Sequence, residues 1–191
     1  MPTVKSVDIR VLRQLPLFRN LNESECRQVA EIIKPLQFHA GDTIVKQGES
    51  SRNLWILQTG VCEVTKRTRP ERSDSEEIVL AIIEPPSYFG EMSFFNPAPN
   101  SANVRARTDM HVLRISHGDY QDLINEGVWA VYKVAYNVIQ GLSDRMRRMD
   151  EWVTELLHDS HPEVINVPEW NQFREKMLNR WKVQESVDGQ V

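Results

Sequence analysis

The most constraining feature of the sequence is a series of short β-favouring runs between Leu36 and Ile115. These runs read IVKQ, LWILQT, VCEVTK, IVLAII, ANVRA and HVLRI. They are separated by turn residues, namely Gly41-Asp42, Gly48-Glu49, Gly60, Pro85-Pro86 and the stretch from Pro97 to Asn100. Many short strands with regular turns are typical of a sandwich or barrel, so we predict a mainly β fold.

Helical patterns flank this region. Asn22 is a plausible N-cap with Glu25 three residues later, which predicts an amphipathic helix from Asn22 to Ile33. A short helix is predicted for His117 to Ile124. The polar stretch from Arg67 to Glu77 lies between two apolar runs and contains charges of both signs, so it is predicted to be a solvated hairpin loop.

The last long pattern is a three-four repeat of apolar residues. It comprises Val128, Val131, Ala135, Val138, Leu142, Met149, Trp152 and Leu156, with Arg145 as the polar interruption. It predicts a helix of roughly 30 residues, or about 45 Å, which is longer than a compact barrel can cover. A second copy of the same helix is the simplest partner. We therefore predict a homodimer with contacts from Val131, Ala135, Val138, Leu142 and Met149.

The length of 191 residues allows one domain with extensions. We predict a β-barrel with N-terminal helices over residues 1–126, a dimerisation helix over 127–158, and a linker with a C-terminal amphipathic helix over 159–191. The apolar face of that last helix contains Trp170, Phe173, Met177 and Trp181. It is expected to pack on the barrel or on the partner subunit; the alternative is a surface that binds another protein.

Composition excludes several function classes. A net charge of −4 disfavours nucleic-acid coating, and the sequence contains no apolar run of membrane-spanning or signal-peptide type, so we expect a cytoplasmic protein. Cys26 and Cys62 lack metal or disulfide spacing and are predicted to be buried apolar side chains. His158 and His161 have no evident third ligand, so no metal site is predicted. We find no catalytic motif and predict no enzyme activity and no cofactor.

The candidate binding segment is YFGEMSFFNPAPNSANVRA, from Tyr88 to Ala106. A strand that turns at Gly90 into a short helix would present free backbone N–H groups to an anion. Gly90 permits close backbone approach. The Glu91 carboxylate can accept a hydrogen bond from a sugar hydroxyl, and Ser93 or Ser101 can donate one to a phosphate.

This segment resembles the phosphate-binding cassette of the cyclic-nucleotide-binding domain family. The similarity covers about Leu12 to Met149, including the glycines at 41, 48 and 60. It implies a double-stranded β-helix (jelly-roll) barrel of catabolite-activator-like type, a long dimerising helix and a regulatory role. It also implies cyclic AMP or cyclic GMP as the ligand, with a site made of Phe89, Gly90, Glu91, Met92, Ser93, Asn100, Ser101 and Ala102.

Two departures from the family follow from the residues. Catabolite-activator-like regulators continue into a helix-turn-helix, but only 33 residues follow His158 here and they are rich in acids, so DNA binding by this chain alone is not expected. The family also places an arginine where this chain has Asn100. Loss of that charge is expected to weaken binding of a cyclic phosphate by about 2 to 5 kcal/mol.

No nearby arginine is expected to compensate. Strand alternation places Ala102, Val104 and Ala106 toward the barrel interior and directs Arg105 and Arg107 outward. The sequence thus leaves three hypotheses: a weak sensor of a cyclic nucleotide or related anion, a ligand-free dimerising module with a degenerate pocket, or a site for an uncharged or larger ligand. A protein partner is compatible with each.

Overall fold

The computed structural model describes residues 8–68 and 76–160, with side chains described to residue 155. The chain divides into two compact units, residues 1–140 and 141–191. The boundary lies inside helix α5 (Ala130–Ser160), so the first turns of this helix belong to the β-rich unit. The C-terminal amphipathic segment predicted from Trp170 to Trp181 and the residue His161 lie outside the described residues.

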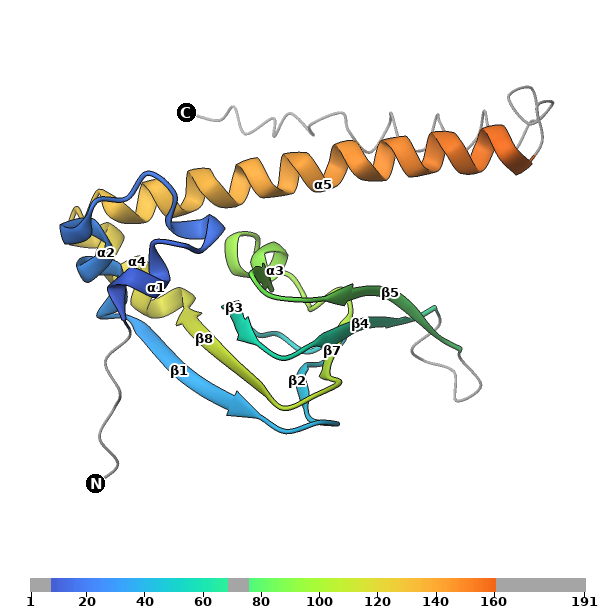
Figure 1. Cartoon of the computed structure of the whole chain (residues 1–191), viewed down its shortest axis with the longest axis horizontal. Helices are drawn as coiled ribbons and strands as arrows, with labels where there is room; N and C mark the ends of the chain where they lie inside the picture. Colours follow the sequence, from blue (N-terminus) through green and yellow to red (C-terminus); the bar gives the residue numbers. More distant parts are fainter. Residues whose placement is uncertain (1–7, 69–75, 161–191) are drawn as a thin grey trace, which may run out of the picture. The chain divides into compact units, whose positions relative to one another are not determined.

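Over residues 8–68 and 76–160, eight strands form two four-stranded sheets. Figure 1 labels most of these strands. Their order is β1-β8-β3-β6 in one sheet and β2-β7-β4-β5 in the other. The strands are β1 (Ile33–Phe38), β2 (Thr43–Val45), β3 (Asn53–Thr59), β4 (Cys62–Arg67), β5 (Glu77–Ile83), β6 (Ser87–Phe89), β7 (Asn103–Ala106) and β8 (Met110–Ser116). The mainly β prediction is confirmed. The two sheets fit the jelly-roll fold that the resemblance implied, but the strand pairings among the described residues do not close them into a barrel.

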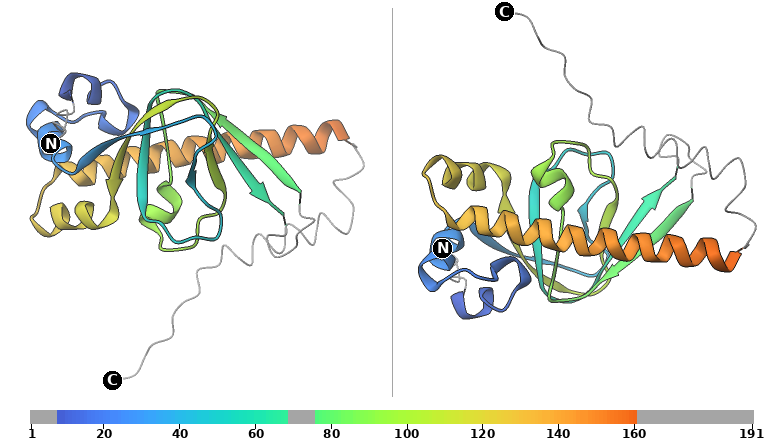
Figure 2. Two further views of the ribbon diagram at one scale, coloured as in Figure 1. Left: turned by 90° about the horizontal axis from the view of Figure 1, so that it is seen from below. Right: turned by 90° about the horizontal axis from the view of Figure 1, so that it is seen from above.

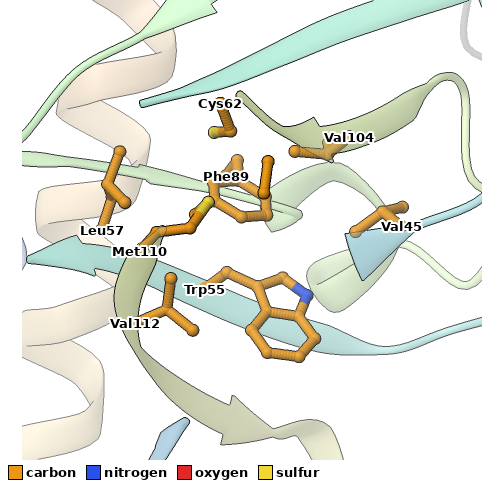
Figure 3. Packing of buried hydrophobic residues seen from close by; sticks show 9 residues of the cluster. Val45, Trp55, Leu57, Cys62, Phe89, Val104, Met110 and Val112 are labelled. Atoms are coloured by element: carbon orange, nitrogen blue, oxygen red, sulfur yellow. The ribbon is translucent and has the colours of Figure 1, made fainter. Parts of the chain in front are cut away.

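The hydrophobic core lies between the two sheets (Figure 3). Trp55 and Leu57 of β3 meet Phe89 of β6, and the rings of Trp55 and Phe89 are stacked with their centroids 6.3 Å apart. The other sheet contributes Val45, Cys62, Val104 and Ala106, and β8 contributes Met110 and Val112. Core residues thus come from both layers, and their packing holds the sheets together.

Both cysteines are buried and free, as predicted. Burial raises the pKa of the Cys62 thiol to about 11, because an apolar surrounding disfavours the thiolate. Cys62 therefore behaves as a small apolar side chain in the core.

Short helices gather at one end of the sheets (Figure 2). They are α1 (Ile9–Leu12), the 3-10 helix Pro16–Phe18, α2 (Glu23–Ala30) and α4 (His117–Asn125), while α3 (Glu91–Phe95) lies within the cassette. The capping box predicted for α2 is present, with Asn22 and Glu25 bonded reciprocally. The α4 prediction is confirmed as well.

The predicted extent of the first helix is wrong. α2 ends at Ala30, and Ile33 is the first residue of β1, where it pairs with Ile115 of β8. Ile33 is buried in this position. Two adjacent isoleucines fit either a helix face or a strand, and the long-range pairing with β8 determined the outcome here.

The hairpin predicted around Arg67 to Glu77 is present as an antiparallel β4–β5 pair. Arg67 pairs with Glu77 at the end of the ladder. Residues 69–75 lie outside the described part. β5 is an edge strand, and its side chains Ile78, Val79, Leu80 and Ile82 are exposed.

The first turns of α5 pack on the N-terminal helices. Ala130, Val131, Val134 and Val138 are fully buried. The Asn137 side chain donates to the Leu17 and Arg19 carbonyl oxygens at 2.9 and 2.8 Å. Lys133 forms an ion pair with Glu25 at 2.6 Å. These contacts fix the start of α5 against the β-rich unit.

This packing corrects the expected dimer contacts. Val131 and Val138 belong to the core of their own chain, and Ala135 and Leu142 are partly buried; only Met149 among the five predicted residues is exposed. Other exposed apolar residues on α5 and just before it follow a repeat shifted by one position, namely Trp129, Tyr132, Tyr136, Ile139, Met146 and Val153. Met149 and Trp152, which belong to the predicted repeat, are exposed as well.

Candidate functional site

The cassette begins with a sharp turn at Gly90, between β6 and α3. Gly90 has φ of 86°, a left-handed conformation that side chains other than hydrogen disfavour. A Cβ atom at this position would lie 2.5 Å from the Asn53 carbonyl oxygen of β3. Gly90 is therefore required both by the turn and by the close approach to the neighbouring strand.

The short helix α3 places the next predicted residues. Glu91 and Ser93 are buried, whereas Met92 is exposed. The Ser93 hydroxyl lies 3.4 Å from the Gly90 carbonyl oxygen and 3.1 Å from Asn100 Oδ1. The structure therefore brings Gly90, Ser93 and Asn100 together, and the Ser93 hydroxyl bonds to the chain itself.

Asn100 is the centre of a buried hydrogen-bond network. Its Nδ2 donates to the Lys46 carbonyl oxygen at 3.0 Å and to Ser51 Oγ at 3.0 Å. Its Oδ1 accepts from Ser51 Oγ at 3.2 Å and from Ser93 Oγ at 3.1 Å. The bond to a carbonyl, which can only accept, fixes the orientation of the amide. Both donors and both acceptor positions of this side chain are thus used within the chain.

The backbone of Asn100 adds to this network. Its N–H donates to the Glu49 carbonyl oxygen and its carbonyl accepts from the Gly48 N–H, both at 2.9 Å. The turn between β2 and β3 is thereby fixed to the end of the cassette by main-chain and side-chain bonds.

The remaining predicted residues divide between core and surface. Phe89 and Ala102 are buried in the domain, and the Ser101 side chain is exposed, with its hydroxyl 3.9 Å from Met92 Sδ. Neither Phe89 nor Ala102 offers a polar side-chain atom to a ligand. Their contribution to a site would come from the backbone and from the shape of the core.

The predicted alternation along β7 is confirmed. Ala102, Val104 and Ala106 are buried, and the side chains of Arg105 and Arg107 are exposed. Arg107 lies 3.8 Å from the Glu63 carboxylate on the outer surface. These arginines therefore do not supply the charge that Asn100 lacks.

Sequence reasoning missed the partners of Asn100 in the 46–52 turn. Ser51 bonds to the Asn100 amide, and Arg52 Nη2 donates to the Phe94 carbonyl oxygen at 3.1 Å, so this turn holds α3 as well. The stretch GESSRN reads as an ordinary polar turn, and no local pattern in it points to residues some 50 positions later.

Comparisons with known proteins agree with the fold. Residues 35–126 match the model of the cyclic nucleotide-binding domain. The chain is 22% identical over 152 residues to the CRP-like cAMP-activated global transcriptional regulator of Mycobacterium tuberculosis, covering 80% of this chain and 64% of that protein. The crystal structure of Thermus thermophilus catabolite activator protein matches with 26% identity and a TM-score of 0.62, covering 74% of this chain and 62% of that one.

A third similar structure is the regulatory subunit of a cAMP-independent protein kinase A from Trypanosoma brucei. It has 20% identity and a TM-score of 0.57, covering 88% of this chain and 50% of that one. This likeness concerns the fold. The chain spans less than two thirds of the length of each of these three relatives.

Together, the jelly-roll sheets, the cassette turn and the long following helix are the fold features of a cyclic nucleotide-binding type of domain. Residues 35–126 match the cyclic nucleotide-binding domain family, and the chain is similar to catabolite-activator-like proteins. Over the ranges that the structure describes, no helix is both long and apolar enough to cross a membrane.

Proposed function

We propose that this chain is a non-enzymatic regulatory module that assembles through α5 and does not bind cyclic AMP or cyclic GMP at micromolar concentrations. The observation that supports it best is the Asn100 side chain, whose hydrogen-bonding capacity is used within the chain where the family has a phosphate-binding arginine. A cyclic phosphate would have to displace these bonds and would gain no charged partner from Asn100 in return.

Assembly is supported by the exposed apolar residues at the start of α5. Tyr136 and Ile139 are 57% and 60% exposed, and Trp129 and Tyr132 precede them on the same helical face. The spacing of 129, 132, 136 and 139 is the three-four repeat of a helix pair. The opposite face is buried in the chain's own core, so a second copy would contact this exposed face.

Light scattering tests the assembly directly. Wild type is expected to have the mass of a dimer, and Ile139→Asp is expected to weaken association by about a hundredfold or more, because each of two equivalent contacts would bury an unpaired carboxylate. The matched control is Ile82→Asp, which makes the same change at a similarly exposed isoleucine of β5. Added millimolar cyclic AMP is expected to leave the wild-type mass unchanged.

A monomeric wild type would contradict the assembly proposal, as would an Ile139→Asp mass equal to that of wild type. A mass that changes on addition of cyclic AMP would contradict the ligand-independent part alone.

The second candidate is a weak sensor of a cyclic nucleotide or related anion. It is supported by the left-handed Gly90 turn and the buried Glu91, which are the cassette features that the resemblance assigns to phosphate and ribose. It differs from the first candidate in a single measurable property, a nucleotide dissociation constant in the micromolar range.

A further inference from the structure

The 46–52 turn and the cassette are joined mainly through one residue. Asn100 bonds to Lys46, Ser51 and Ser93 with its side chain, and to Gly48 and Glu49 with its backbone. The two segments lie about 50 positions apart in the sequence, so these bonds connect distant parts of the chain.

The chemistry of the Asn100 oxygen resembles that of an anion oxygen. Oδ1 accepts from two hydroxyl groups, Ser51 Oγ of the 46–52 turn and Ser93 Oγ of α3. Hydroxyl donors that converge on one point are a typical way to bind a phosphate oxygen. Here the convergence point is occupied by an amide oxygen of the chain.

A second pair of contacts extends from the same turn. The Gln47 side chain donates to the Arg67 carbonyl oxygen at 3.2 Å and accepts from the Arg67 N–H at 2.8 Å. The Gln47 N–H donates to Asn103 Oδ1 at 2.8 Å. The turn that Asn100 holds is thereby also connected to the end of β4 and to β7.

We infer that Asn100 is a built-in acceptor that replaces the oxygen of a bound anion and holds the cassette and the 46–52 turn together without any ligand. This goes beyond the proposed function, because a ligand-independent module could equally contain an empty, loosely held cassette. In this chain the arrangement is permanent, and the β4–β5 hairpin is connected to it through Gln47.

Hydrogen exchange of the full chain tests the inference. Asn100→Ala removes both the acceptor and the donors, so amide exchange in residues 46–52 and 91–102 is expected to accelerate by about tenfold or more. Exchange in β3 and β8 is expected to stay at the wild-type rate. The control is Asn125→Ala, which alters an exposed asparagine at the end of α4 and is expected to change neither segment.

The double variant Ser51→Ala with Ser93→Ala retains Asn100 and removes the two hydroxyl donors to its oxygen, together with the Ser51 acceptor of its Nδ2. It provides the same readout if Asn100→Ala fails to fold, and it is expected to accelerate exchange in the same two segments. Unchanged exchange in these segments, or a uniform increase that includes β3 and β8, would overturn the inference. Neither outcome depends on nucleotide titration, so a failure here is distinct from a failure of the proposed function.

Discussion

Gly90→Ala is expected to lower the free energy of unfolding by about 3 to 5 kcal/mol. Two effects add at this position. The left-handed backbone disfavours any Cβ, and that Cβ would lie 2.5 Å from the Asn53 carbonyl oxygen and 3.1 Å from Trp55 Cδ1. The nearest atom, the Asn53 carbonyl oxygen, belongs to the backbone of the central strand β3, so it cannot move away without disturbing that strand. Urea unfolding monitored by fluorescence measures this decrease in the free energy of unfolding.

Gly41→Ala is the matched control for this prediction. Gly41 has φ of 94°, but a Cβ there would meet nothing within 4 Å. Gly41→Ala is therefore expected to lower the free energy of unfolding only by the cost of a Cβ in left-handed backbone, about 1 to 2 kcal/mol. Equal losses at the two glycines would show that the close approach to Asn53 contributes nothing, and the explanation of the cassette turn would then be wrong.

Asn100→Arg is expected to produce the largest change in ligand affinity. An arginine restores a cation to the phosphate position, and the corresponding free energy of about 2 to 5 kcal/mol equals roughly thirty-fold to a few thousand-fold in the dissociation constant for cyclic AMP.

The control for the arginine variant is Asn100→Gln, which lengthens the side chain without adding charge. It is expected to disturb the hydrogen bonds to Lys46 and Ser51 and to gain no affinity. Equal affinities for the arginine and glutamine variants would show that the missing charge is not what limits binding.

The sequence predicted the β-rich unit well because the relevant signal is local. Strands such as LWILQT and HVLRI combine β-favouring side chains with glycine turns, and each became a strand of the two sheets. The alternation along β7 was equally readable, since Arg105 and Arg107 lie outward between small buried residues.

The helix register shows where local reasoning fails. A three-four repeat on α5 can be drawn through Val131 and Val138 or, one position later, through Tyr132 and Ile139. Both stripes are apolar, and only the packing against α4 and the N-terminal helices decides which one is buried. Of the predicted stripe, Val131 and Val138 belong to the chain's own core, whereas Met149 is exposed.

Only part of the candidate site could be predicted from the sequence, because the bonding partners of Asn100 are distant along the chain. The loss of the arginine charge at Asn100 follows from the sequence alone. The partners that the amide found in its place are a carbonyl oxygen at Lys46 and a hydroxyl at Ser51, some 50 residues away. Such contacts depend on how β2 and β3 are placed by the whole fold, which no sequence period encodes.

The most direct test is a calorimetric titration of the wild-type chain with cyclic AMP and with cyclic GMP. Because Asn100 has its bonding capacity used by Lys46, Ser51 and Ser93, we predict no binding heat up to several hundred micromolar of either nucleotide. A saturable heat with a dissociation constant in the low micromolar range would contradict the account and would establish the chain as a nucleotide sensor.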